Sequence, residues 1–357
     1  MIQTITLRNI RVYEQLRLEF PQRLSVLFGL NGTGKTTVLE GVHALCTTKS
    51  FRTTQLSELV RHGYTEGLIE ADLTNMEHRR IELRPRRKTF IRNHDTCKNH
   101  SIFIQGQGIV SLAPEHQALI TGSSEGRRKF LDQLIFGMDE QYIDTIRQYQ
   151  RIIRHKQALL KQDLSLDFYS DQVRPWNQKL LDLGQDIRQR RIEMIFELLP
   201  RVQKEYRHLA NAHTSFDLAY RYDSHESLQD QLTKQSHVEH ISRRALFGPH
   251  RDDVLIRLYD QKAQTVASQG EKASILLSLK LGELELLKES ASAPPILLLD
   301  DIGMTLDPER RQKLFERLEH ETVQTIVSAC DLDITEKVKQ VGGQVMEKQK
   351  QNDEIWA

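Results

Sequence analysis

The chain has 357 residues, of which 38 % are hydrophobic and 28 % charged, and its formal net charge is +1. This balance predicts a globular protein with two domains, or with one large domain that carries an insertion, and it means that any affinity for nucleic acid comes from local basic patches. No apolar run approaches membrane-spanning length, the N-terminus lacks the apolar core of a signal peptide, and Cys46, Cys97 and Cys330 have no metal-ligand spacing, so we expect a cytoplasmic protein without membrane contact.

The first predicted elements lead into a phosphate-binding loop. Residues 2–7 and 16–20 alternate like strands, joined through residues 9–15, and residues 24–28 form a short buried strand. Residues 29–36, GLNGTGKT, fill every fixed position of the G-x-x-x-x-G-K-[ST] motif, and an apolar-periodic helix continues from Thr37. Both the motif and its strand-loop-helix context predict a bound nucleoside triphosphate.

The loop suits phosphate because its glycines let backbone N–H groups point inward at a helix N-terminus. Lys35 would reach the β- and γ-phosphates and the Thr36 hydroxyl would bind Mg²⁺. The expected ATP contacts are Gly29, Asn31, Gly32, Thr33, Gly34, Lys35, Thr36 and Thr37.

A basic segment follows the next predicted strands, residues 67–73 and 80–83. Arg86, Arg87 and Lys88 lie at the expected tip of a hairpin. Contact with a DNA backbone and a plain solvated hairpin are equally good interpretations.

Residues 125 to about 213 have a helical pattern and predict an inserted helical domain. Apolar residues from Leu131 to Ile153 indicate one long amphipathic helix, and stripes over residues 176–187 and 195–206 indicate others. These stripes are packing surfaces rather than a cofactor site. Residues 223–240 are polar and stay unassigned.

The last third returns to strands and carries the second set of candidate residues. A strand at 254–258 and a helix from 271 to about 289 precede residues 296–299, a fully apolar strand that ends in Asp300 and Asp301. In a phosphate-loop ATPase, Asp300 would hold Mg²⁺ and Asp301 would orient or deprotonate the attacking water. Ser268 either caps the following helix or presents its hydroxyl to a γ-phosphate.

The order of these motifs resembles ABC-type ATPase heads of the SMC class, and nearly the whole chain is similar to the RecF family of recombination mediators. The stretches that carry the resemblance are 9–13, 29–36, 49–52, 113–115, 120–123, 127–132, 247–253, 268–270 and 297–301. The resemblance implies an α/β fold: a phosphate-loop α/β core with an antiparallel β subdomain and an inserted α-helical lobe. We expect an N-terminal ATPase part over 1–122, the helical lobe over 123–244 and a C-terminal ATPase part over 245–357.

The resemblance also implies how the protein works. Two copies would be joined by ATP, with trans contacts to the γ-phosphate from Ser268, Gln269, Gly270 and Asp307. The dimer would bind duplex DNA and gapped DNA, act with RecR, RecO and RecA, and hydrolyse ATP weakly with stimulation by DNA.

The sequence departs from the family at Glu271-Lys272, at Gly303-Met304-Thr305 before Leu306-Asp307, and at Thr37. Ser328 lies in the predicted strand 325–329, where ABC transporters carry a switch histidine. We therefore expect slow hydrolysis, with ATP acting mainly as a clamp.

Several assignments stay open. Gln105, Gln107 and Glu115 are alternatives for the side chain that senses the γ-phosphate, and Arg11 suits nucleotide, DNA or a surface role. His250 is expected to order its loop. The competing functions are an ATPase subunit of a membrane transporter and a phosphate-loop kinase for a small molecule.

Overall fold

The structure is a computed structural model that describes all residues except 22, 211–215, 223–235, 291–292 and 348–357. It forms two compact units. Unit 1 comprises Met1–Gln117, Lys204–His213 and Ser268–Ala357, and unit 2 comprises Ala118–Gln203 and Thr214–Ala267.

These units differ from the predicted domains in three segments. Residues 118–122 and 245–267 belong to unit 2, and residues 204–213 belong to unit 1. The assignment of residues 245–267 to unit 2 has a clear physical reason. Strand β10 (Asp253–Leu258) pairs along its whole length with β9 (Phe216–Arg221), so its backbone hydrogen bonds hold the returning chain in unit 2.

A five-stranded parallel sheet forms the centre of unit 1, in the order β14-β3-β13-β12-β8. Its strands are β3 (Leu24–Phe28), β8 (Ile109–Leu112), β12 (Ile296–Leu299), β13 (Thr325–Ala329) and β14 (Gln344–Glu347). Every residue of β12 and β13 is buried, as expected for strands of a parallel sheet. The bounds predicted for β3, β12 and β13 agree with the structure.

The second sheet of unit 1 is antiparallel and six-stranded, in the order β2-β1-β4-β5-β6-β7. Its strands are β1 (Ile2–Ile10), β2 (Tyr13–Glu19), β4 (Gly67–Leu73), β5 (His78–Arg84), β6 (Arg87–Arg92) and β7 (Asp95–Thr96). The long connection predicted at 9–15 is wrong. Ile10 pairs directly with Tyr13, so only Arg11 and Val12 make the turn.

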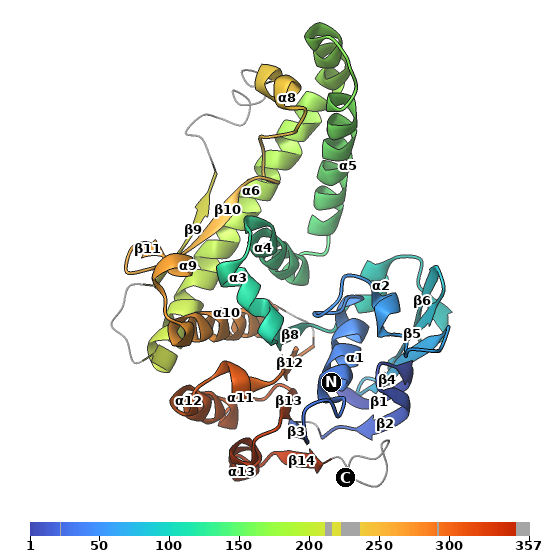
Figure 1. The fold of residues 1–357 in the computed structure, drawn as a ribbon, viewed down its shortest axis with the longest axis vertical. Helices are drawn as coiled ribbons and strands as arrows, with labels where there is room; N and C mark the ends of the chain where they lie inside the picture. The colour runs from blue at the N-terminus through green and yellow to red at the C-terminus, as the bar shows by residue number, and fades with distance from the viewer. Residues whose placement is uncertain (22, 211–215, 223–235, 291–292, 348–357) are drawn as a thin grey trace. The chain divides into compact units, whose positions relative to one another are not determined.

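The two sheets share one hydrophobic core with α1 (Lys35–Thr47). Leu7, Ile69 and Ile81 of the antiparallel sheet, Val38 and Val42 of α1, and Leu298 and Ile326 of the parallel sheet all lie in it. The other elements of unit 1 are η1 (Leu56–Leu59), α2 (His100–Ile104), η2 (Pro114–Gln117), α10 (Gln269–Ser290), α11 (Ile302–Thr305), α12 (Pro308–Glu319) and α13 (Leu332–Gln340). Figure 1 labels the α-helices among these elements.

Unit 2 is mainly helical and also contains a three-stranded antiparallel sheet, in the order β11-β10-β9, with β11 at Gln261–Lys262. Its helices are α3 (Ala118–Thr121), α4 (Ser124–Met138), α5 (Tyr142–Leu160), α6 (Leu166–Ala210), α8 (Ser236–Ser242) and α9 (Ala263–Val266), and the last residues of α6 lie in unit 1. Helices α5 and α6 lie side by side (Figure 1), and the rings of His155 and Trp176 contact each other between them.

The helical pattern was correct, but its division into helices was not. The single helix predicted from Leu131 to Ile153 is two helices, because Asp139 ends α4 and its carboxylate accepts a hydrogen bond from the Gln141 N–H at 2.9 Å. Conversely, the stripes at 176–187 and 195–206 belong to one helix, α6, which continues through Pro175 and Pro200.

The segment 247–253, one of the family-like stretches, is fixed by polar contacts inside unit 2. Arg188 donates to both oxygens of Asp252 at 2.7 and 2.9 Å, and Arg127 donates to both oxygens of Asp253 at 2.9 and 3.1 Å. His250 lies 2.8 Å from the Tyr149 hydroxyl and 3.3 Å from the Ala245 carbonyl. These bidentate pairs hold the segment in one geometry.

In the part of the chain that the structure describes, no helix has both the length and the apolar character needed to cross a membrane.

Candidate nucleotide-binding site

The loop between β3 and α1 has the backbone that a phosphate cradle requires. Gly32 and Gly34 have φ angles of 82° and 96°, in the left-handed region that favours glycine. A Cβ on Gly34 would lie 2.5 Å from the Tyr13 hydroxyl oxygen, so a side chain has no room there. The same hydroxyl donates to the Thr33 carbonyl at 3.0 Å and so supports the loop.

Lys35 begins α1, and its ammonium group lies over the loop. Its Nζ donates to the carbonyls of Gly29 and Leu30 at 2.7 and 2.8 Å. Burial lowers the pKa of Lys35, while the neighbouring Cys330, Asp301 and Asp300 act in the opposite direction. Asn31 and Gly32 are exposed at the loop tip, and Thr37 is buried in the first turn of the helix.

The structure brings two distant parts of the chain together at Thr36. Its hydroxyl donates to Asp300 Oδ1 at 3.0 Å. Strands β3 and β12 are parallel and separated only by β13, so the residues that follow both strands meet at the same edge of the sheet.

Ser328, on the intervening strand β13, joins the two aspartates. Its hydroxyl donates to Asp300 Oδ1 at 2.6 Å and accepts from the Asp301 N–H at 2.9 Å. Asp301 has a φ of 50°, in the left-handed region, and stands at the start of α11. The sequence pointed to Ser328 only as the residue at the position of a transporter's switch histidine, and it did not predict these hydrogen bonds. A serine is unusual in a buried apolar strand, and that was the available signal for a polar contact.

Asp300 is a buried carboxyl group, 4 % exposed. Burial raises its pKa, hydrogen bonds from Ser328 and Thr36 lower it, and the negative charges of Asp301 and Glu115 raise it further. A cation at this point would relieve the cost of holding these carboxylates close together.

Among the alternatives for the γ-phosphate sensor, only Glu115 lies near the site. It follows the carboxyl end of β8, whose last residue accepts a hydrogen bond from Asp300 N at 2.7 Å, and its charge acts on Asp300. Gln107 precedes the other end of β8 and is buried, bonded to the Pro294 carbonyl at 2.9 Å. Gln105 also precedes β8, and its carbonyl accepts from Arg79.

Arg52, in the family-like stretch 49–52, pairs with Glu115 at 3.4 Å. Arg11 pairs instead with the buried Glu40 of α1 at 3.3 Å. This ion pair fastens the β1–β2 turn to α1. Such a role for Arg11 was not among the nucleotide, DNA and surface roles considered from the sequence.

Ser268 forms a capping box with Glu271 at the start of α10. The Glu271 N–H donates to Ser268 Oγ at 3.2 Å, and the Ser268 N–H donates to Glu271 Oε2 at 2.8 Å. Ser268 and Gln269 are exposed. The structure shows the cap, which is one of the two roles considered for Ser268, and an exposed cap also leaves this helix start accessible to a second molecule.

Asp307 lies at the start of α12, and its side chain accepts from the Arg310 N–H at 3.0 Å. The Arg310 side chain connects Asp307 to Ser274 of α10. Sequence reasoning did not single out Arg310, although its position three residues after a helix-capping Asp is a recognisable signal.

At the basic hairpin, the three tip residues differ from the other arginines. Arg80 pairs with Glu82 at 3.1 Å, Arg92 with Glu77 at 2.8 Å and Arg84 with Glu82 at 3.5 Å. By contrast, Arg86, Arg87 and Lys88 are exposed, and no acidic side chain among the described residues pairs with them. The uncompensated positive charge is therefore confined to the tip.

Comparison with known proteins identifies the family of this chain. The sequence model of the family described as "RecF/RecN/SMC N terminal domain" matches residues 1–353. The chain is 30 % identical over 342 residues to the DNA replication and repair protein RecF of Desulfitobacterium hafniense, covering 92 % of this chain and 93 % of that protein. It is 32 % identical over 349 residues to the protein of the same name from Geobacter metallireducens, covering 93 % and 92 %.

Solved structures give the same result. The structure titled "recombination mediator protein RecF-ATPrS in RecFOR pathway" matches with a TM-score of 0.84 and 25 % identity, covering 100 % of this chain and 97 % of that one. An Smc head bound to the C-terminal winged-helix domain of ScpA matches with a TM-score of 0.58 and 13 % identity, covering 99 % and 95 %, which supports the fold alone. The expected ATPase-head fold is thereby confirmed.

Proposed function

Because this chain belongs to the RecF family of DNA replication and repair proteins, within the wider RecF/RecN/SMC family, we propose that it is an ATP-dependent DNA-binding protein of recombinational repair. ATP joins two copies on duplex DNA near a single-strand gap, and slow hydrolysis releases them. The observation that carries the proposal is the hydrogen bond between Thr36 and Asp300, which assembles one half of an ATPase site from distant parts of the chain.

ATP binds at the loop of residues 29–36. The Gly29–Gly34 backbone and the N-terminus of α1 surround the phosphates, and Lys35 exchanges its two carbonyl contacts for phosphate oxygens. A solved structure similar to this chain is described as the recombination mediator protein RecF-ATP, which supports the choice of nucleotide.

Mg²⁺ fits the residues present. The Thr36 hydroxyl and the Asp300 carboxylate lie 3.0 Å apart and offer the hard oxygen ligands that Mg²⁺ prefers. No cluster of three or more His, Cys, Asp or Glu side chains suited to a metal occurs within the described residues, which agrees with an ion held by one carboxylate, one hydroxyl, phosphates and water. When bound, the ion would neutralise charge on the phosphates.

Hydrolysis uses the acidic residues around the γ-phosphate. Asp301 orients or deprotonates the attacking water, and Glu115 senses the γ-phosphate in place of a glutamine. The Ser328 hydroxyl is hydrogen-bonded to both Asp300 and Asp301. Ser328 therefore holds these two residues in place and does not act as a switch histidine would. We therefore expect weak ATPase activity, stimulated by DNA.

The second half of each site comes from another copy. Ser268, Gln269 and Gly270 at the start of α10, with Asp307, reach the γ-phosphate bound by the partner. Support comes from the exposure of Ser268 and Gln269 and from the positive end of a long helix at this point.

DNA is contacted through its phosphates. The tip residues Arg86, Arg87 and Lys88 supply uncompensated charge, so binding reads backbone and shape rather than base edges. RecR, RecO and RecA are the partners that the family implies, and the cytoplasm is the compartment in which such a complex meets chromosomal DNA.

The test is sedimentation of the wild-type chain with and without a slowly hydrolysed ATP analogue, each with and without gapped DNA. We expect the mass to double only with the analogue, and the affinity for DNA to rise with it. ATP binding with no change in mass or in DNA affinity would overturn the proposal.

A further inference from the structure

We infer that Arg310 is a positioning residue that joins the two elements expected to reach the partner's nucleotide, so that they move as one. The inference deepens the proposed function, because it depends on an ATP-joined dimer. The two elements are the start of α10, with Ser268-Gln269-Gly270, and Asp307 at the start of α12.

The Arg310 guanidinium contacts both elements. Its Nη1 forms an ion pair with Asp307 Oδ2, and its Nε donates to Ser274 Oγ at 2.5 Å. The Ser274 hydroxyl in turn donates to the Gly270 carbonyl at 3.2 Å. A continuous chain of hydrogen bonds therefore runs from Asp307 through Arg310 and Ser274 to Gly270.

Gly270 provides the space for this arrangement. A Cβ built on Gly270 would lie 3.1 Å from Arg310 Nη1 and 3.3 Å from its Cζ. The planar guanidinium thus packs closely against the helix at a residue without a side chain. This contact gives the glycine of Ser-Gln-Gly a role in packing as well as any role at a phosphate.

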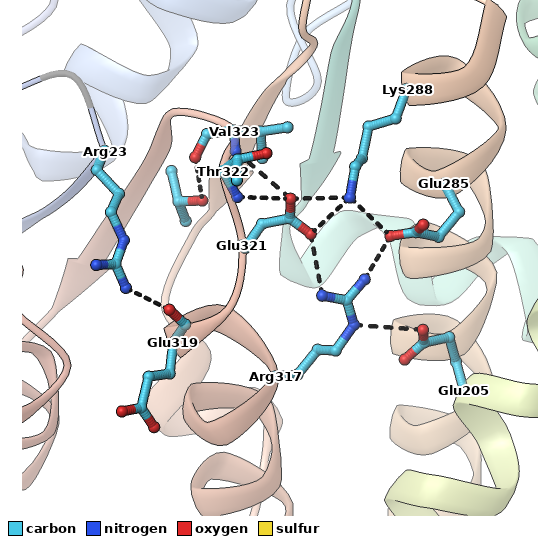
Figure 2. A network of polar contacts seen from close by, with 10 residues as sticks. Arg23, Glu205, Glu285, Lys288, Arg317, Glu319, Glu321, Thr322 and Val323 are labelled. Atoms are coloured by element: carbon cyan, nitrogen blue, oxygen red, sulfur yellow. Dashed lines mark hydrogen bonds and ion pairs between the residues drawn. The ribbon is translucent and has the colours of Figure 1, made fainter.

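A second arginine of α12 offers a matched comparison. Arg317 lies two turns after Arg310, on the same face of the helix. It donates to Glu321 at 3.0 Å and pairs with Glu285 of α10 and with Glu205 of α6 (Figure 2). Both arginines therefore fasten α12 to α10, but only Arg310 touches residues expected to reach across a dimer.

The geometry requires an arginine. A guanidinium directs separate N–H groups to Asp307 and Ser274 at once, whereas a lysine ammonium is a single point charge on a flexible stem. The Asp307 side chain is 41 % exposed and Ser268 is also exposed. Without the guanidinium these two residues would be oriented independently, and dimer formation would have to order both at a cost in free energy.

The experiment compares Arg310→Lys and Arg310→Ala with wild type and with Arg317→Lys. A fluorescent ATP analogue measures binding to the monomer at low protein concentration, and sedimentation equilibrium with a slowly hydrolysed analogue measures dimerisation. We expect both Arg310 variants to bind nucleotide as wild type does, within about twofold, and to dimerise about tenfold more weakly or worse. Arg317→Lys should lower the melting temperature and leave dimerisation unchanged. Gly270→Ala displaces the guanidinium from the opposite side and should weaken dimerisation in the same way.

Equal dimerisation by wild type and the Arg310 variants would overturn the inference alone. So would a loss of dimerisation matched by an equal loss of nucleotide binding to the monomer, or an equal effect of Arg317→Lys on dimerisation. If the wild-type chain itself stays monomeric with the analogue, the proposed function fails, and the inference fails with it.

Discussion

Thr36 and Asp300 are 264 positions apart in the chain, yet the hydroxyl of one donates to the carboxylate of the other at 3.0 Å. This bond connects the residue after the phosphate-loop lysine to the first residue after β12. Ser328 approaches the same carboxylate oxygen at 2.6 Å, so Asp300 Oδ1 accepts two hydroxyl groups. The carboxylate is thus held at the point where a Mg²⁺ ion would meet bound phosphates.

Replacing Ser328 by Ala should impair the use of Mg²⁺. The change removes one hydrogen bond to Asp300 and leaves the Asp301 N–H without its acceptor, so we expect a loss of about 1–3 kcal/mol in unfolding free energy. Half-saturation of ATPase activity should also need several times more Mg²⁺. Chemical denaturation and Mg²⁺ titrations check both effects, with Ser328→Thr, which retains the hydroxyl, as the control. If Ser328→Ala titrates like wild type, Ser328 has no positioning role.

Replacing Asp301 by Asn should separate dimerisation from hydrolysis. Asn cannot deprotonate water, so turnover should fall by about 100-fold or more while ATP still binds. The dimer formed with ATP itself should then persist, whereas the wild-type dimer dissociates as ATP is consumed. Sedimentation after timed incubation measures this lifetime. Hydrolysis at the wild-type rate would remove Asp301 from the catalytic assignment.

Acid should destabilise unit 2 through His250. Burial lowers its pKa to about 4, although a hydrogen bond to the Ala245 carbonyl acts in the opposite direction. An unfolded chain binds a proton at His250 below the ordinary pKa of about 6.5, whereas the folded chain does not until about pH 4. Stability is therefore complete above pH 6.5 and falls by up to about 1.4 kcal/mol per pH unit between 6.5 and 4.

His250→Gln should flatten this part of the curve of unfolding free energy against pH. Denaturant titrations at several pH values measure the slope for both proteins. A slope that is the same in the variant and in wild type would mean that His250 does not titrate as described.

The three tip residues of the hairpin should control the salt dependence of DNA binding. If Arg86, Arg87 and Lys88 each contact one phosphate, replacing all three by Ala should reduce the slope of log K against log salt by about 2.7. Replacement of the paired Arg80 and Arg84 should change the slope much less, because Glu82, which pairs with both, and Glu70 and Glu66, which pair with one each, already compensate their charge. Fluorescence anisotropy with duplex DNA at several salt concentrations gives both slopes. Equal slopes for wild type and the tip variant would leave the hairpin as a solvated surface.

Much of the phosphate-binding half was predictable from the sequence, because local patterns determine it. The glycines at 32 and 34 and the apolar run of β12 carry their structure in a few adjacent residues. The aspartates after β12 could be placed near Thr36 only because parallel strands end at one edge of a sheet.

The remaining features depend on contacts between distant residues and were not predictable. Asp139, where α4 ends, pairs with the distant Arg190 of α6 besides accepting from the Gln141 N–H, and α6 continues through Pro175 although proline disfavours a helix interior. The bonds of Ser328 and Arg310 involve partners on other elements, and the choice of Glu115 over Gln107 required knowing the direction of β8. Sequence patterns therefore identified the candidate residues but not the contacts that hold them.

The central claim is that each complete ATP site takes its phosphate loop from one copy and Ser268 from the other. The most direct test mixes two inactive variants, Lys35→Met, whose Ser268 is intact, and Ser268→Arg, whose loop is intact. With a slowly hydrolysed ATP analogue, we predict that neither variant dimerises alone and that the mixture forms heterodimers containing one complete site. If the mixture stays as monomeric as its components, or if either variant dimerises alone like wild type, the claim is contradicted.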